Sequence, residues 1–224
     1  MDFTELMTWI LPSIVPLILG VGWHEAAHAY TARWLGDDTP ERMGRITLNP
    51  LRHIDPFGTV ILPILLLIVS KGAFSFGYAS TPVDYSRLKR INNKSAIQLV
   101  SLAGPVANLL MAIGWAILYA LFSSALGGDK FFVLMSEQGI RLNLVLFALN
   151  LFPILPLDGG RILNGFLPKN ISAQFERLEP YGFWILLFLL YATPIITKFW
   201  MAPIVHGLQA FLQPLIVTIQ SLFS

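Results

Sequence analysis

Long apolar segments separated by short polar stretches make up most of the chain. The three longest, residues 6–35, 96–126 and 131–157, each exceed the roughly 20 residues that an α-helix needs to cross a bilayer. Shorter apolar segments lie at residues 56–70, 181–197 and 203–223. The pattern predicts an all-α multi-pass membrane protein with about five to six transmembrane segments.

Composition agrees with this pattern. Hydrophobic residues make up 55% of the 224 residues and charged residues 12%, against about a quarter in soluble domains. The polar stretches are too short for a second folded domain, so we expect residues 1–224 to form a single integral-membrane domain. The 15 Lys and Arg residues balance 13 acidic residues and cluster in short loops, which is typical of membrane anchoring. Nucleic acid is therefore not an expected partner.

The first apolar segment contains His24, Glu25 and His28 in the pattern His-Glu-x-x-His. On a helix the two histidines share one face, so both imidazoles can reach one metal ion while Glu25 lies beside a metal-bound water. Random placement of the 4 His and 6 Glu residues would give about 0.002 such patterns. A carboxylate inside a spanning helix is also costly and usually faces a polar interior or a water-filled cavity, so Glu25 marks a candidate functional site. The pattern is typical of zinc peptidases.

The second apolar segment, residues 56–70, would give only about 22 Å of helix against a hydrocarbon core of about 30 Å. Basic residues lie on both sides of it, so a full crossing would break the excess of positive charge on the cytoplasmic side. We expect a re-entrant or surface element between the first two long helices. Alternating residues at 46–48 and 74–78 predict two short strands there, which could hold an extended substrate by strand addition.

A catalytic zinc ion takes three protein ligands, and with no Cys in the chain the third must be His, Asp or Glu. Asp158 follows Pro153 and Pro156, which interrupt an apolar segment, and such breaks are tolerated where they line a cavity. If residues 56–70 do not cross, Asp158 lies on the same side as the histidines. A simple turn role for Asp158 stays open as the alternative.

Two further residues compete with Asp158 as the third ligand. His53 and Asp55 lie in a polar loop that contains Pro and Arg. We interpret both as solvated or capping residues, and a role for His53 in tuning the cleft stays open.

With both signatures in order, His-Glu-x-x-His and Asn150-x-x-Pro-x-x-x-Leu-Asp-Gly159, the sequence resembles the site-2 protease family of intramembrane zinc metalloproteases. Further similarity lies in residues 44–58, 76–79 and 103–109, so the likeness covers roughly residues 20–165. The resemblance assigns His24, His28 and Asp158 to one zinc ion, Glu25 to the general base and Asn150 to the lining of the substrate cleft. Leu155 departs from the pattern, since many members have proline there.

The resemblance implies a compact member without PDZ or CBS domains that cleaves peptide bonds of transmembrane proteins or peptides within or near the lipid bilayer. We expect it in the inner membrane of a prokaryotic cell, with the site toward the cytoplasm. Asn150 could donate its amide to the substrate backbone or to the developing oxyanion. The alternative is a non-catalytic membrane protein, either a metal-binding transporter or a degenerate protease scaffold that binds partner helices.

Overall fold

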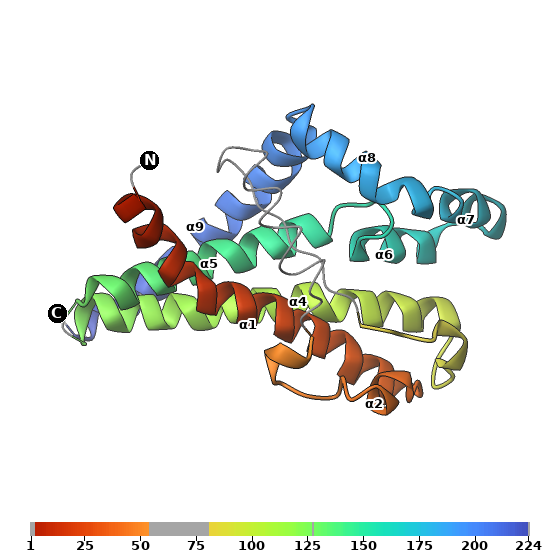
Figure 1. Ribbon diagram of the computed structural model, residues 1–224, viewed down its shortest axis with the longest axis horizontal. Coiled ribbons are helices and arrows are strands. Elements are labelled where there is room, and N and C mark those ends of the chain that lie inside the picture. Colours follow the sequence, from red (N-terminus) through yellow and green to blue (C-terminus); the bar gives the residue numbers. More distant parts are fainter. Residues whose placement is uncertain (1–2, 54–80, 127, 224) are drawn as a thin grey trace. The chain divides into compact units, whose positions relative to one another are not determined.

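The computed structural model describes residues 3–53, 81–126 and 128–223, and in this part of the chain every regular element is a helix (Figure 1). The α-helices are α1 (Phe3–Leu35), α2 (Thr39–Arg42), α4 (Asn93–Ser124), α5 (Lys130–Asn150), α6 (Asp158–Phe166), α7 (Lys169–Glu176), α8 (Glu179–Tyr191) and α9 (Ala202–Ser221). Two 3-10 turns, η1 (Pro50–Arg52) and η3 (Tyr85–Arg87), and a π-helical stretch, η4 (Ile195–Met201), complete the set.

Four of the helical segments are long and apolar enough to cross a membrane. They are Ile10–Leu35, Asn93–Ser124, Lys130–Asn150 and Ile195–Ser221, and α8 is a shorter apolar helix. The predicted all-α membrane fold is thus confirmed, whereas the predicted count of five to six spans stays a prediction.

The predicted strand-containing element falls largely outside the described residues. Residues 56–70 and 74–78 both belong to the part that the structure does not describe. Residues 46–48 are described and form no strand, since Thr47 and Leu48 lie in a bend directly before η1.

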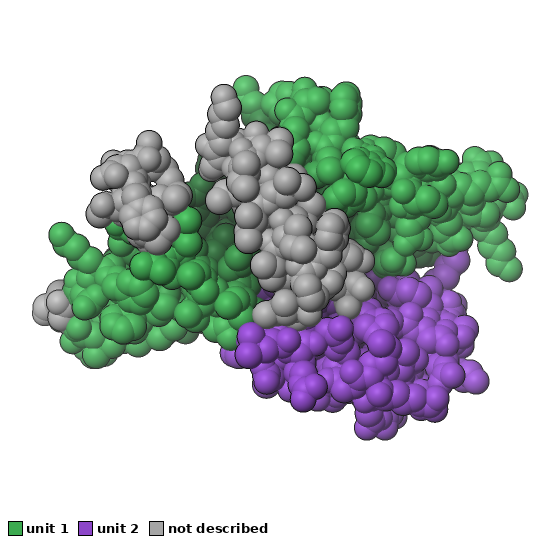
Figure 2. All heavy atoms as spheres, in the orientation of Figure 1, with its two compact units in different colours: residues 1–20, 105–224 green, residues 21–104 purple. Residues whose placement is uncertain are grey.

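The chain divides into two compact units (Figure 2). Unit 1 comprises residues 1–20 and 105–224, and unit 2 comprises residues 21–104. The division falls inside α1 and α4, so each of these helices contributes residues to both units.

The core of unit 1 lies among α4, α5 and α9. Ala112, Ala116 and Ala120 are fully buried at every fourth position of α4, which lets other helices approach its backbone closely. Gly139 of α5 allows the Trp115 side chain of α4 to pack against the α5 backbone, because a Cβ at residue 139 would overlap the indole ring. Small residues therefore set the spacing of these apolar helices.

The core of unit 2 joins the end of α1 to the start of α4. Ala32, Leu35, Leu88, Ala96 and Val100 form this buried cluster. The carbonyl oxygen of Leu35 accepts hydrogen bonds from the backbone N–H groups of Lys89, at 3.2 Å, and Arg90, at 3.3 Å. The segment that leads into α4 is thus hydrogen-bonded directly to the end of α1.

Asp37 adds a second connection within unit 2. Its carboxylate is fully buried and accepts hydrogen bonds from the backbone N–H of Thr39, at 2.9 Å, and of Asp84, at 2.8 Å. These bonds satisfy a charge that would otherwise be costly to bury, and they tie the start of α2 to residues just before η3.

Candidate metal centre

His24 and His28 lie one turn apart on α1, as predicted from their spacing. Their Nε2 atoms are 3.0 Å apart, and the two rings meet edge to face with centroids 4.6 Å apart. Both side chains are buried, with 7% and 8% of their surface exposed. Two imidazole nitrogens this close together can bind a single ion, since zinc–nitrogen bonds measure about 2.0–2.1 Å.

A backbone carbonyl fixes the tautomer of His28. Its Nδ1 lies 2.7 Å from the carbonyl oxygen of Val100 in α4. Because a carbonyl oxygen only accepts hydrogen bonds, Nδ1 carries the proton and the lone pair of Nε2 is left for a metal. The carbonyl also holds the ring in place, as partners of metal-binding histidines generally do.

Gly104 leaves open the space beside the two Nε2 atoms. A Cβ at residue 104 would lie 2.5 Å from Nε2 of His28 and 2.6 Å from Nε2 of His24. An ion bound by both nitrogens requires this space, and only glycine keeps it empty. The donor set and the opening beside it therefore fit a zinc ion.

Glu25 is buried with the histidines, at 6% exposure. Its backbone carbonyl accepts a hydrogen bond of 3.0 Å from Oγ1 of Thr81. The motif thus has a tertiary contact beyond the helix that carries it, and both partners belong to unit 2.

Asp158 belongs to unit 1 and is the first residue of α6. The predicted helix break is confirmed, because α5 ends at Asn150 and the chain turns before α6 begins. Three glycines allow other backbone segments to pack against this turn: a Cβ at Gly159, Gly160 or Gly182 would overlap backbone atoms of residues 151–155. An ion pair of 2.8 Å from Arg161 to Glu179 joins α6 to α8.

Asn150 ends α5 and is half-buried. Its Nδ2 donates a hydrogen bond of 3.0 Å to the carbonyl oxygen of Leu146, one turn earlier in the same helix. One amide hydrogen is therefore used within α5, and the predicted place of Asn150 in a substrate cleft stays a prediction.

Known proteins with similar sequences include "Putative zinc metalloprotease YwhC" of Bacillus subtilis (strain 168), which is 42% identical over 81% of this chain and 80% of its own length. "Putative zinc metalloprotease Rip2" of Mycolicibacterium smegmatis is 31% identical over 85% of this chain and 72% of its own length. Both relatives belong to the site-2 protease family. This chain belongs to the site-2 protease family. No protein-family model and no solved structure matches it.

As a member of this family the chain is a zinc metalloprotease, and the arrangement of His24, Glu25 and His28 fits that activity. The expectation of a zinc cofactor is confirmed, and the four long apolar helices make this metalloprotease a membrane protein. The non-catalytic alternative is not favoured by these relatives.

His53, the alternative candidate for the third ligand, is buried and not solvated. Only 1% of it is exposed, its Nε2 lies 3.0 Å from the carbonyl oxygen of Thr47, and it follows η1 as the capping residue. The solvated position is therefore wrong for His53, which is buried, and its backbone N–H closes the end of η1 by donating to the carbonyl oxygen of Pro50. Asp55 lies outside the described residues.

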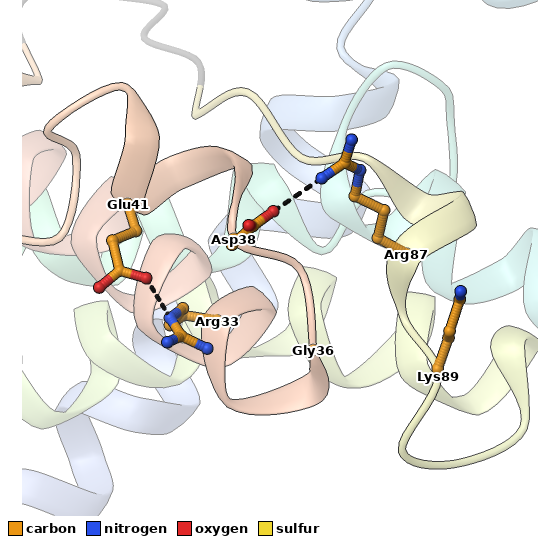
Figure 3. A pocket seen from close by; sticks show the side chains of 6 residues that line it. All are labelled: Arg33, Gly36, Asp38, Glu41, Arg87 and Lys89. Atoms are coloured by element: carbon orange, nitrogen blue, oxygen red, sulfur yellow. Dashed lines mark hydrogen bonds and ion pairs between the residues drawn. The ribbon is translucent and has the colours of Figure 1, made fainter.

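Charged residues line a separate cavity of about 560 Å³ in unit 2 of the metalloprotease (Figure 3). Arg33 pairs with Glu41, and Arg87 pairs with Asp38 at 2.7 Å, while Lys89 and Gly36 complete the wall. Partial burial raises the pKa of Asp38, but hydrogen bonds and positive charge from Arg42 and Arg87 outweigh burial and lower the pKa below its ordinary value. None of the motif residues lines this cavity.

Sequence reasoning missed three groups in this protease: the carbonyl of Val100, and the side chains of Asn108 and Asn143. The contact of Val100 depends on how α4 packs against α1, which no local pattern reveals. The two asparagines could have been noticed in the sequence, because an amide side chain within an apolar spanning segment needs a hydrogen-bond partner, often on another helix.

Proposed function

We propose that the protein is an intramembrane zinc endopeptidase that hydrolyses peptide bonds of transmembrane protein substrates within or near the bilayer. The observation that carries this proposal is the placement of two buried imidazoles, 3.0 Å apart and beside the opening at Gly104, on a helix long enough to cross a membrane. A hydrolytic site within a spanning helix suits a substrate that is itself in the membrane.

We propose Asp158 as the third zinc ligand and residues 1–224 as one functional domain. The support is chemical: catalytic zinc sites take three protein ligands, and carboxylate oxygen is an accepted one. Asp158 also opens α6 directly after a break in the apolar segment, at a turn whose glycines admit close packing. Because Asp158 and the histidines belong to different units, the ligand set stays a proposal.

A zinc ion held by His24 and His28 would supply a more acidic bound water and a polarised scissile carbonyl. Glu25 then acts as the base that takes a proton from the attacking water and passes it to the amine nitrogen as the C–N bond breaks. The second amide hydrogen of Asn150 is proposed to donate to the substrate backbone or to the oxyanion. A helical substrate hides its carbonyls in internal hydrogen bonds, so it must unwind locally before attack.

The hydrogen bonds from Lys89 and Arg90 to Leu35 support a membrane topology in which the segment before α4 lies on the same side as the end of α1. With α4 leading out and α5 leading back, Asp158 then returns to the side of the histidines. The excess of Arg and Lys in the loops at this side supports a cytoplasmic orientation, in the inner membrane of a bacterial cell.

The test uses the purified chain in lipid vesicles with a single-pass model peptide of about 20 apolar residues and a glycine-rich centre. We expect mass spectrometry to find cuts inside the apolar stretch for the wild-type protein. Glu25→Gln should keep its zinc and lose cleavage by at least about 100-fold, because the base is removed while both histidines remain. The matched control is Glu41→Gln, an acid of the same unit that pairs with Arg33.

Two outcomes would overturn the proposal. Cuts confined to residues outside the apolar stretch would mean that this metalloprotease does not act within the membrane. A Glu25→Gln variant that cleaves as fast as the wild type would remove Glu25 from the chemistry.

A further inference from the structure

Two asparagines lie fully buried in apolar helices of unit 1. Asn108 belongs to α4 and Asn143 to α5, and both are 0% exposed. An amide in such surroundings costs free energy unless it is hydrogen-bonded, so its partners show what it holds together.

The hydrogen bonds of this pair connect three helices. Nδ2 of Asn108 donates to Oδ1 of Asn143, at 3.1 Å, and to the backbone carbonyl oxygen of Gly20 in α1, at 3.0 Å. Nδ2 of Asn143 donates to the carbonyl oxygen of Gly139, at 2.9 Å, one turn earlier in α5. The bond to Gly139 orients the Asn143 amide so that its oxygen faces Asn108.

Gly20 is placed so that this contact bears on the metal-binding motif. It lies four residues before His24 in the continuous helix α1, so its carbonyl belongs to the turn that leads directly into the motif. A Cβ at residue 20 would lie 3.3 Å from Oδ1 of Asn143 and 3.2 Å from Leu146, so glycine is what allows the close approach here.

A hydrogen bond to the backbone restrains a helix more directly than side-chain packing does. Sliding α1 by one residue would turn it by about 100° and move its side chains by about 1.5 Å along the axis. Metal sites tolerate errors of only about 0.2 Å in ligand distance. A fixed point one turn before His24 therefore reduces the freedom of both imidazoles.

We propose that Asn108, oriented by Asn143, is a positioning residue of the zinc site: it fixes the rotation and the height of α1 at Gly20 and so holds His24 and His28 in line for one ion. This inference rests on the proposed zinc-dependent function, and it concerns how the ligands are held rather than the chemistry. Asn108 itself touches neither metal nor substrate.

The experiment compares zinc affinity and the cobalt-substituted absorption spectrum of purified full-length variants. Asn108→Leu removes both donated hydrogen bonds at nearly constant volume, and Asn143→Leu removes the acceptor that orients Asn108 together with the bond from Asn143 to Gly139. We expect zinc affinity, measured by chelator competition, to fall about 10–100-fold in Asn108→Leu, as is typical when a residue that supports metal ligands is lost. Asn143→Leu should show a smaller loss, and the visible bands of bound cobalt should shift in both variants.

The matched control is Ser123→Ala in the same helix α4. It removes the hydrogen bond of 2.8 Å from Nε2 of Gln220 to Oγ of Ser123, which joins α4 to α9 far from the motif. This variant should change thermal stability without changing zinc affinity or the cobalt spectrum.

The proposal is overturned if Asn108→Leu melts at a lower temperature but binds zinc and cobalt as the wild type does. It is equally overturned if neither asparagine variant folds while Ser123→Ala does, because the pair would then serve stability alone. Cleavage does not enter this readout. A protein that binds zinc but cuts no transmembrane peptide would sink the proposed function and leave the positioning role intact.

Discussion

At the scale of single residues, Gly104 offers a sharp test of the metal centre. In Gly104→Ala the new methyl group would lie 2.5 Å from Nε2 of His28 and 2.6 Å from Nε2 of His24, closer than any normal contact. The imidazoles or α4 must then shift, and the methyl fills space that an ion needs. We expect zinc content, measured by elemental analysis of the purified protein, to fall to less than about a tenth of the wild-type value, with cleavage falling in proportion.

The chain supplies its own control for this substitution. Gly114 lies in the same helix, and a Cβ there would meet no atom within 4 Å. Gly114→Ala should keep its zinc and gain up to about 1 kcal/mol in stability, since alanine is the better helix former. If Gly104→Ala kept full zinc content, the opening beside the two nitrogens would not be the metal position.

How much of the site was predictable also differs from residue to residue. His24, Glu25 and His28 follow from their spacing, because i and i+4 share a face on any helix. The role of Gly104 does not, because it depends on α4 meeting α1 at one particular height. Nothing in the sequence says which side chains Gly104 faces.

At the scale of elements, the turn between α5 and α6 depends on α8. Gly182 in α8 contacts the turn so closely that a Cβ there would overlap the carbonyl oxygen of Leu155. Gly182→Ala must therefore push the turn away from α8. We expect a loss of about 1–3 kcal/mol, the usual cost of overpacking, measured by denaturant unfolding in detergent micelles.

A matched variant isolates this effect. Gly207 lies in α9, and a Cβ there would meet nothing within 4 Å. Gly207→Ala should leave stability unchanged or slightly raised. Equal stability of Gly182→Ala and Gly207→Ala would show that the turn is free to yield, and then α8 would have no part in holding Asp158.

Element boundaries were predictable where a single local signal sets them. The long apolar segments became α1, α4 and α5 because length and hydropathy suffice to specify a spanning helix. Pro153 and Pro156 correctly marked the end of α5, since proline cannot donate the backbone hydrogen bond that a helix requires. Residues 46–48 failed as a predicted strand, because alternation over three residues is too short a signal to outweigh the turn before η1.

At the scale of the whole molecule, the motif and Asp158 belong to different units, so the proposed site depends on topology. The hydrogen bonds from Lys89 and Arg90 to Leu35 hold the segment before α4 against the end of α1, which supports the proposed topology. The excess of Lys and Arg in the loops predicted this topology from the sequence. Such a charge bias indicates only which side of the membrane a loop prefers, and it does not say which residues are in contact. The hydrogen bonds within unit 2 add a direct contact between the two segments.

This topology can be tested directly, because the chain contains no cysteine of its own. Single cysteines can be placed at four exposed positions, which are Met43 after α2, Arg90 before α4, Lys130 at the start of α5 and Lys169 at the start of α7. With a membrane-impermeant maleimide on intact cells, we expect labelling only at Lys130→Cys, and the other three should react only after the membrane is opened. Labelling of Lys169→Cys in intact cells, with Met43→Cys protected, would put Asp158 across the bilayer from His24 and His28. No helix packing could then bring the three ligands to one ion.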